Sequence, residues 1–204
     1  MNAVNKSWLP MYAVVVSMFL ICAVPADAHL NSTGMGPFYD GSMHFLMSPE
    51  DILPVLALAL LAGLRGAAFG RRALFVLPTA WLLGGFLGLT TAATNGNAVV
   101  SAIWFLLLGG LLAADAKLSL RVMTGLAALL GIYHGYLNGS GMGQPGTGAV
   151  ALVGLIFALF VLIALAAAFV VRLRAQWARI GVRVAGSWIV ASGLLMLGWA
   201  FRTG

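Results

Sequence analysis

Six long stretches of the chain consist almost entirely of apolar residues, and they limit its possible folds more than any other feature. About 20 such residues are enough to cross the hydrocarbon core of a bilayer as a helix. Of the 204 residues, 62% are hydrophobic and only 8% are charged, which excludes an ordinary soluble domain. We therefore expect an all-α fold, a polytopic membrane helix bundle of about six transmembrane helices. The expected spans are 51–69, 73–94, 98–114, 118–138, 148–171 and 184–201.

Residues 1–28 have the pattern of a secretory signal peptide. A lysine precedes the apolar run 11–24, and the small-x-small site Ala26-Asp27-Ala28 follows it. This run is too short to cross a bilayer comfortably, so we favour cleavage over an uncleaved first helix. The prediction leaves 29–204 as a single transmembrane domain that begins with an outer segment, 29–50.

The basic residues lie in alternate loops of this layout. Nine of the eleven fall in the loops 65–72, 115–121 and 172–183. Loops rich in arginine and lysine remain in the cytoplasm, so the protein is expected in a bacterial inner membrane with its mature N-terminus in the periplasm. The pI of about 10.3 is then a consequence of topology. The bilayer is the expected partner, and nucleic acid is not.

Histidines and carboxylates gather on the predicted outer side. His29 would be the first mature residue, where its imidazole and the free amine together could chelate a metal ion. The alternative is that cleavage simply has to leave some residue there. Asp40 and His44 are four residues apart, on one face if that stretch is helical. A carboxylate with an imidazole suits nickel, cobalt, zinc or copper, and the alternative is a solvated loop with an Asp-Gly turn.

The sequence Ser48-Pro49-Glu50-Asp51 is typical of a helix start. It offers an N-cap serine, a proline at the first helical position and two acids in the first turn. Capping therefore explains Glu50 and Asp51 without any function, although both could also attract a cation at an entrance. Both interpretations stay open.

His134 lies about one turn from the outer end of the fourth predicted span, on the same face as Asn138. An ionisable residue at such depth is by default a functional candidate. The candidate metal ligands are therefore His29, Asp40, His44, Glu50, Asp51 and His134. The methionines of the outer side would suit copper(I), and they are also common filler in membrane helices.

Two motifs make the chain resemble the HupE/UreJ family, small membrane proteins encoded near hydrogenase and urease genes and regarded as nickel or cobalt permeases. The family signature of histidine, five residues and Asp-His corresponds to HFLMSPED, with His44 first and Glu50 and Asp51 at the Asp-His pair. The motif FHGxAHGxE corresponds to YHGYLNGSG, with His134 kept and Asn138 at the second histidine. The string 36–66 looks most like a divergent second HupE/UreJ group.

The leading hypothesis is an inner-membrane permease for a divalent transition metal ion, nickel or cobalt first and copper next. The sequence has no ATP-binding motif, and an enzyme is not expected. The alternative is an outer-face metal-binding chaperone or assembly factor that does not transport. A copper redox enzyme built on His29 is a third, weaker possibility. Further partners could be a second copy of the chain or a metalloenzyme under maturation.

Overall fold

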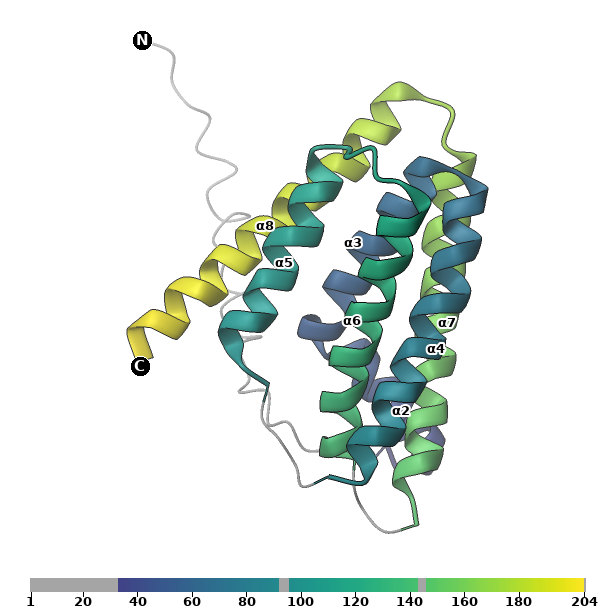
Figure 1. Ribbon diagram of the computed structural model, residues 1–204, viewed down its shortest axis with the longest axis vertical. Coiled ribbons are helices and arrows are strands. Elements are labelled where there is room, and N and C mark those ends of the chain that lie inside the picture. Colours follow the sequence, from purple (N-terminus) through teal and green to yellow (C-terminus); the bar gives the residue numbers. More distant parts are fainter. Residues whose placement is uncertain (1–32, 92–95, 143–145, 204) are drawn as a thin grey trace, which may run out of the picture.

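The computed structural model describes residues 33–91, 96–142 and 146–203, and their regular structure is entirely helical (Figure 1). The predicted all-α helical membrane bundle is confirmed. The seven helices are α2 (Pro37–Met47), α3 (Pro49–Arg65), α4 (Ala67–Leu89), α5 (Ala98–Ala113), α6 (Leu120–Gly141), α7 (Gly148–Arg172) and α8 (Gln176–Thr203).

Three of the described helices, α4, α7 and α8, are long and apolar enough to cross a membrane. A fourth span is possible if α2 and α3 count as one broken helix, since they meet at an angle of 73°. Helix α5 is apolar but has only 16 residues. Helices α3 to α8 match the six expected segments in order, whereas six as the number of spans stays a prediction.

Two predicted loops are mostly helical. The loop expected at 65–72 is reduced to Gly66, because a φ of 111° at this residue lets α4 begin one residue after α3 ends. The loop expected at 172–183 ends at residue 175, and α8 begins at Gln176, eight residues earlier than the predicted start at 184. Part of the outer segment 29–50 is also a helix, α2.

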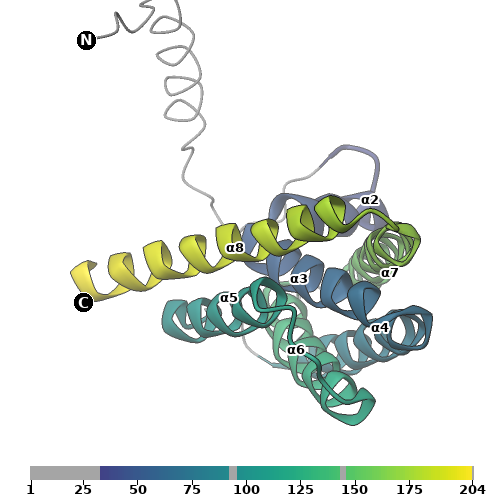
Figure 2. The same ribbon diagram turned by 90° about the horizontal axis from the view of Figure 1, so that it is seen from above.

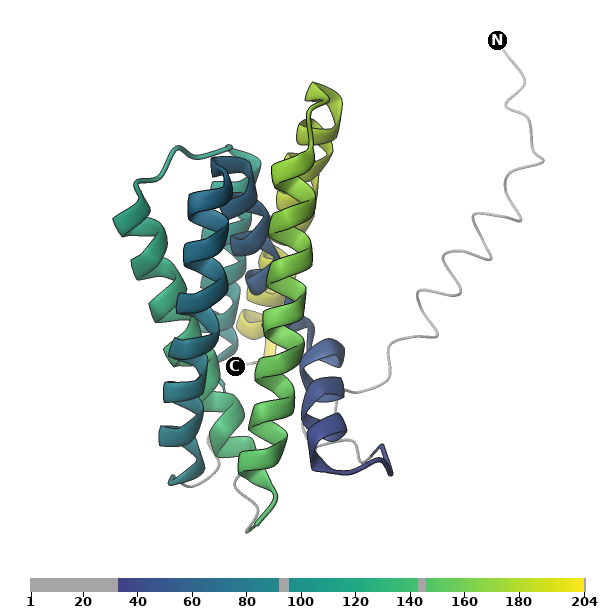
Figure 3. The same cartoon turned by 90° about the vertical axis from the view of Figure 1, so that its right-hand side faces the viewer.

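Helix α3 lies in the middle of the bundle. Helices α4, α6 and α7 flank one side of it and α5 and α8 the other (Figures 1 and 2). The short helix α2 packs beside α7 near one end (Figure 3). We call this end, with α2 and the loops that follow α4 and α6, the site end. The opposite end has the turns at 66, 114–119 and 173–175, and we call it the arginine end.

Glycines bring α4 and α6 into direct backbone contact. Gly131, Gly135 and Gly139 recur every four residues on α6 and so share one face. A Cβ atom at Gly135 would overlap the backbone of Trp81 on α4, and one at Gly139 would overlap Gly85. Small residues at such spacing allow helices in lipid to pack closely, because van der Waals contact replaces the hydrophobic driving force available in water. This contact fixes the position of α6 in the bundle.

Replacing Gly135 with alanine is therefore expected to destabilise the protein by about 1–3 kcal/mol, since the added methyl group must push α6 away from α4. The matched control is Gly125→Ala on the same helix, where a Cβ atom meets nothing within 4 Å. Its stability should stay equal or rise, because alanine favours a helix over glycine. Unfolding in mixed detergent micelles measures both, and equal stability of the two variants would contradict the packing role.

Candidate functional site

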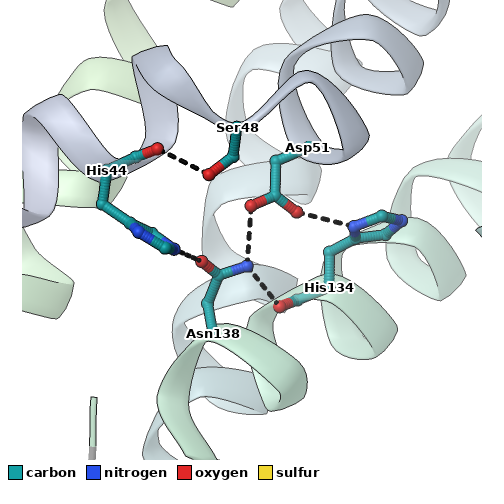
Figure 4. A network of polar contacts seen from close by, with 5 residues as sticks. All are labelled: His44, Ser48, Asp51, His134 and Asn138. Carbon is teal, nitrogen blue, oxygen red and sulfur yellow. Dashed lines mark hydrogen bonds and ion pairs between the residues drawn. The ribbon is translucent and has the colours of Figure 1, made fainter. Parts of the chain in front are cut away.

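Five polar side chains form one connected network at the site end (Figure 4). His44 comes from α2, Ser48 from the break between α2 and α3, Asp51 from α3, and His134 and Asn138 from α6. Asp51, His134 and Asn138 are buried inside an otherwise apolar bundle. Polar groups at such positions must satisfy one another, so their mutual geometry is tightly constrained.

Asp51 is the centre of this network. Its side chain is only 4% exposed, and its two oxygens have separate partners. Oδ1 lies 2.7 Å from Nδ1 of His134, and Oδ2 accepts a hydrogen bond of 2.9 Å from Nδ2 of Asn138. A carboxylate in an apolar interior is tolerated only with this kind of pairing. The first turn of α3 is thereby tied to α6.

The two ring nitrogens of His134 have different surroundings. Nδ1 faces Asp51, whereas the buried Nε2 has no hydrogen-bond partner among the described residues. Aromatic rings surround the imidazole, with centroid distances of 5.5 Å to Trp81, 6.4 Å to Trp104 and 5.2 Å to Tyr133. Histidines that bind metals typically donate one ring N–H to a carboxylate and coordinate through the other nitrogen. His134 has this arrangement.

Asn138 connects His44 to the buried pair. Its Oδ1 lies 3.0 Å from Nε2 of the half-buried His44, while its Nδ2 donates to Asp51 and to the backbone oxygen of His134. Since the carboxamide oxygen can only accept, His44 is the donor and carries a proton on Nε2. The network therefore runs from His44 through Asn138 to Asp51 and His134.

The helix start at residue 48 differs in one respect from the prediction. Pro49 occupies the first turn of α3 as expected, but the side chain of Ser48 forms no capping bond. Its hydroxyl instead donates to the backbone oxygen of His44 at 2.7 Å, which supports the last turn of α2. Of the two acids, Glu50 is exposed and Asp51 is buried, so simple capping describes Glu50 better than Asp51.

The other candidate ligands lie outside the network. Asp40, in the first turn of α2, accepts hydrogen bonds from the backbone N–H and the hydroxyl of Thr33. His29 lies outside the described residues. Among the residues described, no three histidine, cysteine, aspartate or glutamate side chains gather closely enough to hold a metal ion. Metal ligation by the six candidates therefore stays a prediction.

Asn138 is the residue whose importance the sequence understates. Its spacing of four from His134 indicates a shared helix face, but nothing in the sequence indicates that it bridges His44 and Asp51. The rings of Trp81 and Trp104 around His134 had no sequence signal at all. A tryptophan in an apolar run can equally belong to an interfacial belt or to the interior.

The family model described as HupE / UreJ protein matches residues 16–196, which is most of the chain. No curated protein and no solved structure matches.

Replacing Asp51 with asparagine should destabilise the protein by about 1–3 kcal/mol, because one buried N–H group of His134 or Asn138 loses its acceptor. Its neighbour Glu50 offers a matched control, since Glu50→Gln changes an exposed acid and should shift stability by less than about 0.5 kcal/mol. Chemical unfolding in micelles measures both variants. A larger loss at Glu50 than at Asp51 would refute the network as a structural element.

Proposed function

The chain belongs to the HupE/UreJ family, and on that premise we propose that it is a permease for a divalent transition metal ion. The family is associated with nickel and cobalt uptake for hydrogenase and urease and is a family of metal transporters. Nickel or cobalt is accordingly the first candidate for the ion, and copper is the next. The ion is the cargo of the protein, and no resident cofactor is proposed.

The observation that carries this proposal is the spacing of donor atoms in the network. Successive atoms of His44, Asn138, Asp51 and His134 lie 2.7–3.0 Å apart. Two nitrogen or oxygen ligands bound at about 2.1 Å to one ion are also about 3 Å apart when they subtend a right angle. Rotation of the Asn138 amide, which would turn its oxygen toward the ion, would therefore let an ion replace the bonds of Asn138 to His44 and Asp51, while the His134–Asp51 bond is kept. Imidazole and carboxylate are suitable ligands for nickel, cobalt and copper.

The network also suggests an order of contacts for the ion. His44 is half-buried and would meet the ion first, Asp51 and Asn138 would receive it next, and the free Nε2 of His134 lies at the deep end. Few ligands at each step suit a permease, because an ion must bind well enough to enter and weakly enough to leave. Facilitated diffusion is the simplest mechanism.

We further propose that the site end faces the periplasm of a bacterial inner membrane. The turns and first helical residues at the opposite end contain most of the arginines, as the positive-inside rule requires of a cytoplasmic face. Glu50, exposed at the start of α3, and Asp40 would then attract cations to the periplasmic mouth. If the signal is cleaved after Ala28, His29 adds an amine-imidazole chelate to that mouth.

Transport into proteoliposomes of purified protein tests the proposal with radioactive nickel or cobalt. His134→Gln removes Nε2 and His44→Gln removes the entry imidazole, so each is expected to reduce uptake about tenfold or more. Tyr39→Phe is the matched control, because this exposed residue shares α2 with His44 but lies outside the network. Uptake at the wild-type rate in both histidine variants would remove the network from the ion path.

One observation favours the second candidate, a metal chaperone or assembly factor without transport. The buried polar residues Asp51, His134 and Asn138 lie at the site end, and α3 from 52 to 64 has no polar side chain. A chaperone would bind the ion in the same proteoliposomes, as equilibrium dialysis can measure, without passing it into the lumen. Binding that depends on His134 with no uptake would decide for the chaperone.

The N-terminal prediction is tested by sequencing the mature protein from membranes. The expected first residue is His29. Blocking the amine by acetylation should then weaken metal binding at the mouth about tenfold, because one of the two chelating nitrogens is lost. A mature chain that begins at any other residue would remove the amine chelate from the mechanism, while leaving the buried network untouched.

A further inference from the structure

The arginine end of α3 is closed by an ion pair. Arg65, the last residue of α3, pairs through Nη2 with Oδ1 of Asp115 in the turn between α5 and α6. The two side chains are 12% and 29% exposed, so the pair is largely withdrawn from solvent. Asp115 has a φ of 50°, a left-handed conformation that aspartate adopts more readily than most residues other than glycine.

Two arginines of α8 also bind to this end of the bundle. We call their contacts, together with the Arg65–Asp115 pair, the closure. Nη2 of Arg179 donates to the backbone oxygen of Leu64 at 3.3 Å, and Nε of Arg183 donates to that of Ala113 at 3.0 Å. These oxygens belong to the last turns of α3 and α5, where carbonyl groups have no partner within the helix and where the helix dipole favours positive charge. The start of α8 is therefore fastened to the ends of both helices.

The closure lies on the same helix as the polar network. Asp51 and Arg65 are separated by 14 residues of α3, or about 21 Å along its axis. The side chains between them are apolar and mostly buried. An ion that leaves His134 toward the arginine end meets first this apolar segment and then three guanidinium groups. Positive charge at an exit opposes the passage of a cation.

Asp115 has no substitute at this end. The other acids that the structure describes, Asp40, Glu50 and Asp51, all lie at the site end. If Asp115 is lost, Arg65 keeps a partly buried charge without a carboxylate, and α3 loses its tie to the α5–α6 turn. The closure is therefore sensitive to one side chain.

We propose that Arg65, Asp115, Arg179 and Arg183 form a gate that must open for the ion to leave at the arginine end. The inference rests on the proposed transport function for its purpose, but the gate itself consists of contacts between helices. In the closed state the ion pair and the two arginine–carbonyl bonds hold the ends of α3, α5 and α8 together. In the open state they separate, which moves the arginine charges aside and admits water to the last turn of α3.

Thiol accessibility tests the gate without any metal. The chain has one cysteine, Cys22, so Cys22→Ser gives a cysteine-free background. Leu61→Cys then places a thiol on a fully buried position of α3, one turn before Arg65. In nanodiscs, Asp115→Asn and Arg65→Gln should each speed the reaction of this thiol with a charged maleimide about tenfold, because the closed state is less populated. Arg174→Gln, an exposed arginine at the same end, should leave the rate unchanged.

The exchanged pair, Arg65→Asp with Asp115→Arg, separates a gate from general damage to the fold. Restored slow labelling in this double variant supports the gate, since the two charges can pair again. Arg183→Gln removes a single carbonyl bond and should give a labelling rate between those of the wild type and Asp115→Asn. It replaces Asp115→Asn as the test variant if that protein is too unstable to purify. Unchanged labelling in folded Asp115→Asn and Arg183→Gln would overturn the proposal. If the wild-type protein takes up no metal while the Asp115→Asn and Arg65→Gln variants are labelled fast, only the transport function is contradicted.

Discussion

A carboxylate in an apolar bundle is costly unless each of its oxygens is paired, and the site end of this protein is arranged around that requirement. Asp51 obtains its two partners from α6, so the first turn of α3 and the half of α6 nearest the site end must stay in register. His44 on α2 joins them through Asn138. One acid thus links three helices and leaves Nε2 as the nitrogen of His134 that has no partner among the described residues.

The rest of the bundle supplies the rigidity that this pairing needs. Glycines at four-residue spacing press α6 against α4, and Gly41 brings the backbone of α2 against Ala151 of α7. The hydroxyl of Ser42 adds a hydrogen bond of 2.8 Å to the backbone oxygen of Gly154 on α7. Because the glycine contacts are between backbones, side-chain repacking cannot absorb a shift there. The polar groups are held to within the short range over which hydrogen bonds form.

The apolar runs and the motif residues made the fold class, the family and the depth of His134 in the bundle predictable from sequence. The helix limits at 66 and 176 were not, since they depend on the conformation of Gly66 and on arginines that find carbonyl partners only in the folded bundle. The sequence also could not indicate which of Glu50 and Asp51 would be buried. Adjacent residues on a helix point about 100° apart, so one became buried and the other exposed. That difference comes from the tertiary packing of α3 in the bundle.

The break at Ser48 has a mechanical consequence. His44 and Asp51 are seven residues apart, yet the 73° bend gives them different supports, α7 for the first and the central α3 for the second. An ion bound between His44 and Asp51 would therefore exert force on α7 and on α3 at the same time. On the proposed function, the bend gives the two candidate ligands separate backbone supports, and a load on Asp51 would pass along α3 to Arg65, 14 residues away. Cargo at one face could in this way be sensed at the other.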